Sequence, residues 1–172
     1  MGCDVFKTGY ERDSELIGFA ERSDDFETLF FGFWSSLVSL SFYLSFHIPQ
    51  VEPDGFDDTS KSIACGKRVR NLPNKKSICD ALLAEKPGNI TFNINKINLT
   101  SGVSVSDDEA LIAMNTAYKH FKIVLEPGGA VALAAILAGK IKTEDKVIGI
   151  ICSGGNIDKS TFRDVLDGKY SS

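Results

Sequence analysis

The stretch Val147-Ile148-Gly149-Ile150-Ile151-Cys152-Ser153-Gly154-Gly155-Asn156 decides the fold of this chain. Its continuous apolar first part predicts a β-strand that is buried on both faces. The strand stops at a Ser-Gly-Gly-Asn turn, and a short amphipathic segment follows from near Asp158. In open α/β sheets ligands bind at the carboxyl ends of strands, and glycines let a backbone approach a ligand closely. The turn is therefore a candidate ligand site, with a plain β-to-α turn as the alternative.

The composition is that of one globular domain. The chain has 172 residues, a hydrophobic fraction of 43% and a net charge of -4. This length suffices for a well-packed core, and the negative charge disfavours nucleic acid as the main partner. Four cysteines (Cys3, Cys65, Cys79 and Cys152) form no CxxC pair and have no histidine beside them. Neither a zinc site nor a disulfide framework is predicted, so reduced thiols and a cytoplasmic location are expected.

The N-terminal part differs from the remainder in composition. Residues 1–28 are polar and acidic, whereas residues 29–48 contain no Asp, Glu, Lys or Arg. Twenty such residues are long enough for a membrane span, but five serines and the lack of a basic flank argue against one. A buried helix or strand pair and a non-native segment are the alternatives. We predict an atypical segment over residues 1–48, non-native, disordered or an apolar helix, with the main domain at 49–172.

Beyond residue 49 the sequence predicts alternating strands and helices. A Ser106–Glu109 capping box starts one helix, and Gly66 and Gly139 suit the residues that end two others. This order predicts a mostly parallel sheet that is covered by helices. The expected strands are 51–53, 102–105 and 147–152, and the expected helices are 60–65, 90–99, 107 onward, 130–138 and one from near 158.

Three acidic positions are candidates for more than solvation. The loop from Glu52 to Asp58 supplies either a helix cap, through Asp57 or Asp58, or oxygen ligands for a hard divalent cation. Asp80 lies in an apolar run, so it is either a capping residue or part of a site. Glu126 precedes the apolar helix and serves either as its cap or as a neighbour of a ligand at the helix N-terminus.

Five groups of residues carry a family resemblance. The groups are Val51-Glu52-Pro53 with Gly55-Phe56-Asp57-Asp58, Ser77-Ile78-Cys79-Asp80, Val105-Ser106-Asp107-Asp108-Glu109, Glu126-Pro127-Gly128-Gly129-Ala130 and Ser153-Gly154-Gly155-Asn156. In order and spacing they resemble the C-terminal half of the serine/threonine dehydratases, fold type II pyridoxal-phosphate (PLP) enzymes that include serine racemase and threonine ammonia-lyase. The resemblance covers about residues 49–168, and it implies an α/β fold with a three-layer, mostly parallel sheet and helices, an incomplete tryptophan-synthase-β-like PLP fold.

The resemblance also implies roles for individual residues. Ser153 matches the serine whose hydroxyl hydrogen-bonds the pyridine nitrogen of pyridoxal 5'-phosphate, with Gly154 beside it. Glu126 matches a glutamate that faces the cofactor region. Glu52, Asp58 and the carbonyl of Phe56 match a divalent-cation site that would take Mg²⁺, Ca²⁺ or Mn²⁺.

The chain departs from the family in two motifs. The lysine that forms a Schiff base with the cofactor lies in a Ser-Phe-Lys-X-Arg type motif, which does not occur here, and Lys7 has unrelated neighbours. The tetraglycine loop that binds the cofactor phosphate is absent too. No catalytic residue is therefore assigned, since the covalent anchor and the phosphate donors are both missing. The chain is expected to be a truncated and inactive fragment.

The function implied for the parent protein is ammonia-lyase chemistry. Such an enzyme converts threonine or serine into a 2-oxo acid and ammonia, so a small amino acid is the expected substrate. Serine racemase activity in the full-length parent and a non-catalytic α/β binding or regulatory domain are the alternatives. The resemblance makes a homodimer the expected assembly, and no membrane partner is expected.

Overall fold

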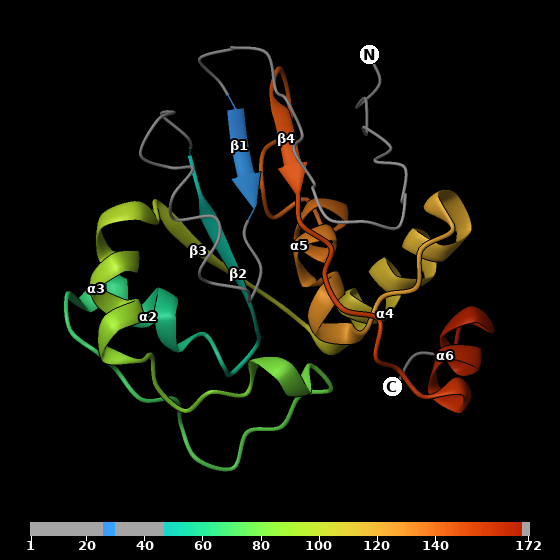
Figure 1. Ribbon diagram of the computed structural model, residues 1–172, viewed down its shortest axis with the longest axis horizontal. Helices are drawn as coiled ribbons and strands as arrows, with labels where there is room; N and C mark the ends of the chain where they lie inside the picture. The colour runs from blue at the N-terminus through green and yellow to red at the C-terminus, as the bar shows by residue number, and fades with distance from the viewer. Residues whose placement is uncertain (1–25, 30–46, 170–172) are drawn as a thin grey trace, which may run out of the picture.

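The computed structural model describes residues 26–29 and 47–169 (Figure 1). Parallel strands and helices follow one another along the chain, as the sequence predicts. In order, the elements are β1 (Phe26–Leu29), β2 (Pro49–Pro53), α2 (Asp58–Cys65), the 3-10 turn η1 (Asp80–Leu82), α3 (Asn89–Asn98), β3 (Ser101–Val105), α4 (Asp107–Thr116), the π-helical turn η2 (Ala117–Phe121), α5 (Pro127–Leu137), β4 (Val147–Ile150) and α6 (Lys159–Leu166).

The strands form two parallel pairs. β2 pairs with β3 so that Val51 lies opposite Val103, and β1 pairs with β4 so that Phe26 lies opposite Val147. β1 also contacts β2, and Figure 1 shows the strands running side by side. The predicted α/β fold with parallel strands and helices is confirmed.

Helices lie on both sides of β2 and β3. α4 and α5 lie on one side, whereas α2 and α3 lie together on the other (Figure 1). α5 is apolar all round and buried from Pro127 to Ala135, as the apolar run at 130–138 predicts, and it lies at the centre of the core. Val51 and Val105 belong to the same core cluster. On the opposite side, a Cβ added to Gly102 would come 1.9 Å from Ser60 Oγ, so β3 and α2 pack closely there.

The capping box of α4 is confirmed, but the apolar face that the three-and-four spacing of Leu111, Met114, Tyr118, Phe121 and Leu125 predicts is shorter than expected. Ser106 Oγ accepts a hydrogen bond from the Glu109 N–H, and the Glu109 carboxylate accepts one from the Ser106 N–H. Leu111 and Met114 are buried, whereas Tyr118 is 37% exposed. The helix widens into a π-helical turn from Ala117, and a π-turn changes the spacing of side chains, so the three-and-four pattern does not continue beyond it.

The expectation that the strand at 147–152 is buried on both faces is wrong. β4 ends at Ile150, and Val147 is 45% exposed. Ile148 and Ile150 pack against the core, so one face of the strand is covered and the other is not.

α3 forms where the helical spacing of Ile90, Ile94 and Ile97 predicts it. Ile90 and Ile97 are 77% and 83% exposed and Ile94 is half-buried, whereas Phe92 and Asn95 are buried. The buried face of the helix is therefore not the face that the isoleucines share.

The interpretations of residues 29–48 mostly lie outside the described residues. β1 crosses the change in composition at residues 28 and 29, and the boundary at Pro49 stays a prediction. In the part of the chain that the structure describes, no helix has the length and apolar character needed to cross a membrane.

Candidate functional site

The Ser-Gly-Gly turn after β4 is seated on the first turn of α5. A Cβ added to Gly129 would lie 1.8 Å from the carbonyl oxygen of Ser153, and one added to Gly155 would lie 3.0 Å from the carbonyl oxygen of Val124. A Cβ cannot lie 1.8 Å from an oxygen, so residue 129 has to be glycine for the turn to lie against the helix, while the contact at Gly155 is tight. The turn is therefore held in a slot that is formed mainly by backbone.

Glu126 holds the turn through two hydrogen bonds. Its N–H donates to the carbonyl oxygen of Gly154 at 3.1 Å, and its Oε2 accepts from the Asn156 N–H at 3.1 Å. Gly154 has a φ of +80°, and a Cβ there would come 2.3 Å from Glu126 Oε1. Glu126 occupies the N-cap position of α5 but makes no side-chain cap bond. The simple cap role is therefore not observed, because the carboxylate reaches across to the turn.

Ser153 presents the polar side chain of the turn. The residue is half-buried, and among the described residues no hydrogen bond of its hydroxyl is observed. A hydroxyl can both donate and accept, so this group is available to a ligand at the carboxyl end of β4.

Cys152, the residue before Ser153, does not add a nucleophile. Burial raises the pKa of its thiol to about 11, and burial raises the pKa of Cys79 to about 12. Both thiols are protonated at neutral pH, and a thiolate is the nucleophilic form. The cysteines within the described residues (Cys65, Cys79 and Cys152) are free.

The 3-10 turn η1 lies against the other side of the α5 N-terminus. A Cβ added to Gly128 would lie 3.6 Å from Ala81 Cβ, which is ordinary contact. Asp107 holds this segment, because its carboxylate accepts from Ser77 Oγ at 2.6 Å and from the Ile78 N–H at 3.2 Å. Asp80 is exposed, so it is not the buried carboxylate that its apolar neighbours suggested.

The acidic loop after β2 is organised by Glu52. Its carboxylate accepts from the Thr59 N–H at 3.1 Å, the Ser60 N–H at 3.0 Å and Ser60 Oγ at 2.6 Å. Glu52 thus caps α2 from the neighbouring strand. Asp57 holds the N-cap position without a side-chain cap bond and pairs with Lys61 instead. Sequence reasoning missed this cap, because it looks for the acceptor next to the helix.

Glu52 and Asp58 are both buried near the N-terminus of α2. Burial raises the pKa of the Glu52 carboxyl above its ordinary value, and burial does the same for Asp58, whose Oδ1 accepts from Asn71 Nδ2 at 2.7 Å. Phe56, which lies between them in the sequence, is also buried, and its N–H donates to the Pro53 carbonyl oxygen. The described residues contain no group of three or more His, Cys, Asp or Glu that would hold a metal ion.

Comparison with known proteins matches residues 29–154 to the family described as "Pyridoxal-phosphate dependent enzyme". The chain belongs to this family. A serine racemase of Dictyostelium discoideum is 40% identical over 119 residues, which cover 67% of this chain and 36% of that protein.

Solved structures of family members share the fold. A threonine deaminase of T.th. superposes with a TM-score of 0.69 at 26% identity, covering 78% of this chain and 50% of the other. Maize serine racemase gives a TM-score of 0.67 at 30% identity, covering 84% and 46%. The chain thus spans about a third of the length of the curated relative and about half of the solved structures.

Pyridoxal phosphate is the cofactor of the family to which the chain belongs.

Proposed function

We propose that the turn after β4 is the pyridine-nitrogen side of a PLP site. Ser153 donates or accepts the hydrogen bond to the ring nitrogen, while Gly154 and Glu126 belong to the same wall. The observation that carries the proposal is the Ser153 hydroxyl, which has no observed partner among the described residues although its turn is firmly seated on α5.

A neutral hydroxyl suits elimination of a β-hydroxyl group. PLP supplies an electron sink when it is bound. Ser153 cannot keep the ring nitrogen protonated as a carboxylate would, so the sink is weaker. Loss of a β-hydroxyl tolerates a weaker sink, because the leaving group carries away the electrons. The parent activity we propose is therefore a threonine or serine ammonia-lyase, in keeping with the threonine deaminase likeness.

A serine racemase activity of the parent protein is the second candidate. The relative with 40% identity is a serine racemase, and so is the maize structure with 30% identity. Both reactions begin with removal of a proton next to the amino group, so the same serine serves either. A cytoplasmic location and a homodimer stay predictions.

We further propose that this chain alone is inactive and is a truncated form of the parent. The Ser-Phe-Lys-X-Arg type motif and the tetraglycine loop do not occur in its sequence. Without the lysine there is no covalent anchor for the cofactor and no base at the substrate.

Glu52, Asp58 and the Phe56 carbonyl remain the proposed cation site. Two buried carboxylates that lack a salt bridge among the described residues attract a hard cation. The fit is partial, since the Glu52 carboxylate already accepts three hydrogen bonds and offers only its remaining lone pairs.

Ligand affinity and ammonia release test the proposed function together. The purified chain is titrated with pyridoxine 5'-phosphate, which lacks the aldehyde of PLP and so does not condense with surface lysines. Its affinity is compared between the wild type, Ser153→Ala and the control Ser101→Ala, which changes an exposed serine at the start of β3. We expect weaker binding in Ser153→Ala alone, by roughly three- to tenfold for one lost hydrogen bond.

The activity arm uses the same proteins with added PLP. With L-threonine or L-serine the chain should release no ammonia above a protein-free control that contains PLP. Release at a catalytic rate would contradict the inactive assignment, and equal affinity of all three proteins for pyridoxine 5'-phosphate would contradict the role of Ser153.

A further inference from the structure

We propose that Glu126 is a positioning residue that acts through the turn. Its carboxylate, held by the Asn156 amide, fixes the Ser153–Gly154 turn on α5 and so directs the Ser153 hydroxyl. The role toward the cofactor rests on the proposed function. The two hydrogen bonds that join Glu126 to Gly154 and Asn156, called the latch from here on, do not depend on it.

The carboxylate of Glu126 lies over the turn with both of its oxygens. Oε2 accepts from the Asn156 N–H at 3.1 Å, and Oε1 lies 2.3 Å from where a Cβ of Gly154 would stand. The Glu126 N–H donates to the Gly154 carbonyl oxygen at 3.1 Å. One residue thus donates to the turn at Gly154 and accepts from it two residues later.

The contact is reciprocal in the manner of a helix capping box, but it joins two separate elements. Glu126 begins α5, and the turn follows β4 about thirty residues later. The first turn of α5 also prevents the turn after β4 from moving toward the helix, since Gly129 already lies against the Ser153 carbonyl oxygen there. With its carbonyl and the next two residues fixed, the direction of the Ser153 Cα–Cβ bond is fixed as well, and the hydroxyl is confined to the staggered positions about that bond.

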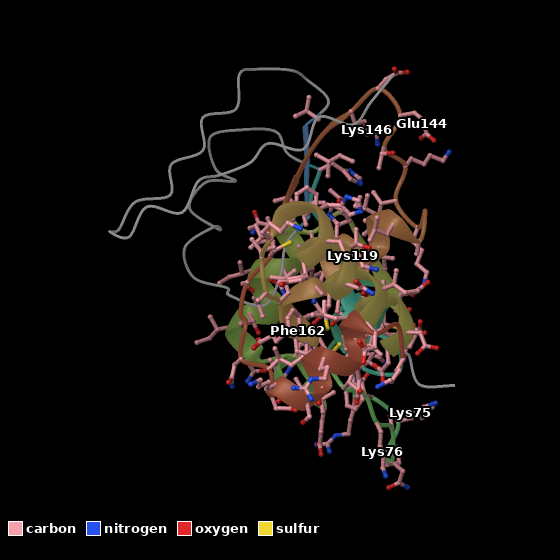
Figure 2. All side chains as sticks on the ribbon, turned by 90° about the vertical axis from the view of Figure 1, so that its right-hand side faces the viewer. Lys75, Lys76, Lys119, Glu144, Lys146 and Phe162 are labelled. Carbon is pink, nitrogen blue, oxygen red and sulfur yellow. The ribbon has the colours of Figure 1, made fainter. Side chains whose placement is uncertain are left out.

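Two variants of Glu126 separate the latch from mere charge. Glu126→Gln keeps an acceptor oxygen of the same reach for the Asn156 N–H, whereas Glu126→Ala removes it. Glu144→Ala is the matched control, because Glu144 is an exposed carboxylate in the loop before β4, near Lys146 (Figure 2).

The first measurement is amide hydrogen exchange at Asn156 by NMR on the full chain. We expect exchange to be roughly three- to tenfold faster in Glu126→Ala, as for loss of one hydrogen bond, and near the wild-type rate in Glu126→Gln and Glu144→Ala. Amides in α5 serve as the internal reference for general destabilisation. An unchanged Asn156 rate in Glu126→Ala would overturn the latch.

The second measurement is a double-mutant cycle on the affinity for pyridoxine 5'-phosphate with Glu126→Ala and Ser153→Ala. If Glu126 acts through Ser153, its removal weakens binding in the wild type and has little further effect once Ser153 is alanine. Additive losses would overturn the positioning role. A wild-type chain that does not bind the analogue would overturn the proposed function and this role with it, while the exchange result still decides the latch.

Discussion

Glu52 lies in a strand but acts as the cap of a helix that begins several residues later. It lies in β2, yet its carboxylate receives the N–H groups of Thr59 and Ser60 at the start of α2. Helix N-termini carry unsatisfied donors and a partial positive charge, so a carboxylate there is stabilising. Burial opposes this and prevails, because the pKa of Glu52 is raised above its ordinary value of 4.5.

The raised pKa of Glu52 makes its contribution to stability depend on pH. Between the ordinary pKa and the higher pKa of the folded chain, the folded state binds more protons than the unfolded state. The free energy of unfolding therefore falls as pH rises through that interval. We expect the stability difference between wild type and Glu52→Gln, measured by urea unfolding at several pH values, to become smaller as pH rises above about 4.5.

Glu109 supplies the opposite case as a control. Partial burial acts to raise its pKa, but hydrogen bonds from Lys140 and Ser106 outweigh this effect and lower it. A lowered carboxyl pKa gives stability that is present above the ordinary value and lost as pH falls. The corresponding difference for Glu109→Gln should therefore grow with pH. Equal slopes for the two variants would show that the environment of Glu52 is not as described.

At the scale of elements, the contact between α5 and the turn after β4 depends on which glycine is lost. Both Gly128 and Gly129 are buried in the first turn of α5. A Cβ added to Gly129 would lie 1.8 Å from the Ser153 carbonyl oxygen, whereas one added to Gly128 would lie 3.6 Å or more from Ala81 and Leu82.

The variants Gly129→Ala and Gly128→Ala form a matched pair. Alanine favours a helix over glycine by about 1 kcal/mol, so Gly128→Ala should be neutral or slightly stabilising. Gly129→Ala forces the turn away, and overpacking of this kind costs typically about 1–3 kcal/mol. Thermal unfolding measures both. If Gly129→Ala were as stable as Gly128→Ala, the turn would not lie where we describe it.

Local signals in the sequence predicted the elements well. Ser106 and Glu109 announced the start of α4, Gly66 and Gly139 lie where α2 and α5 end, and Asp158 caps α6 through the Thr161 N–H. These signals succeed because each depends on residues a few positions apart.

Contacts between distant elements were not predictable in the same way. The cap that Glu52 provides to α2, the reach of Glu126 to Asn156 and the exposure of Ile90 and Ile97 all depend on which elements become neighbours. One sequence states the period of a helix but not which of its faces meets the core. The candidate site was predictable at Ser153 because strand ends bind ligands, whereas the latch required the fold.

At the scale of the whole molecule, the chain is an α/β unit of the PLP-dependent family built around α5. The buried helix, the parallel strands and the two segments that flank its N-terminus place Ser153 at one edge of that unit. The chain spans 36% of the length of its Dictyostelium relative, so the activity of the parent enzyme remains a proposal.

The most direct test of this account is an NMR titration of the ¹⁵N-labelled chain with pyridoxine 5'-phosphate. This analogue keeps the pyridine ring but lacks the aldehyde, so it does not condense with surface lysines. We predict saturable amide shifts at residues 126, 128–130 and 152–156, weakened in Ser153→Ala. Shifts that are scattered over other residues, or equal in Ser153→Ala, would contradict the assignment of this turn as the pyridine side of the site.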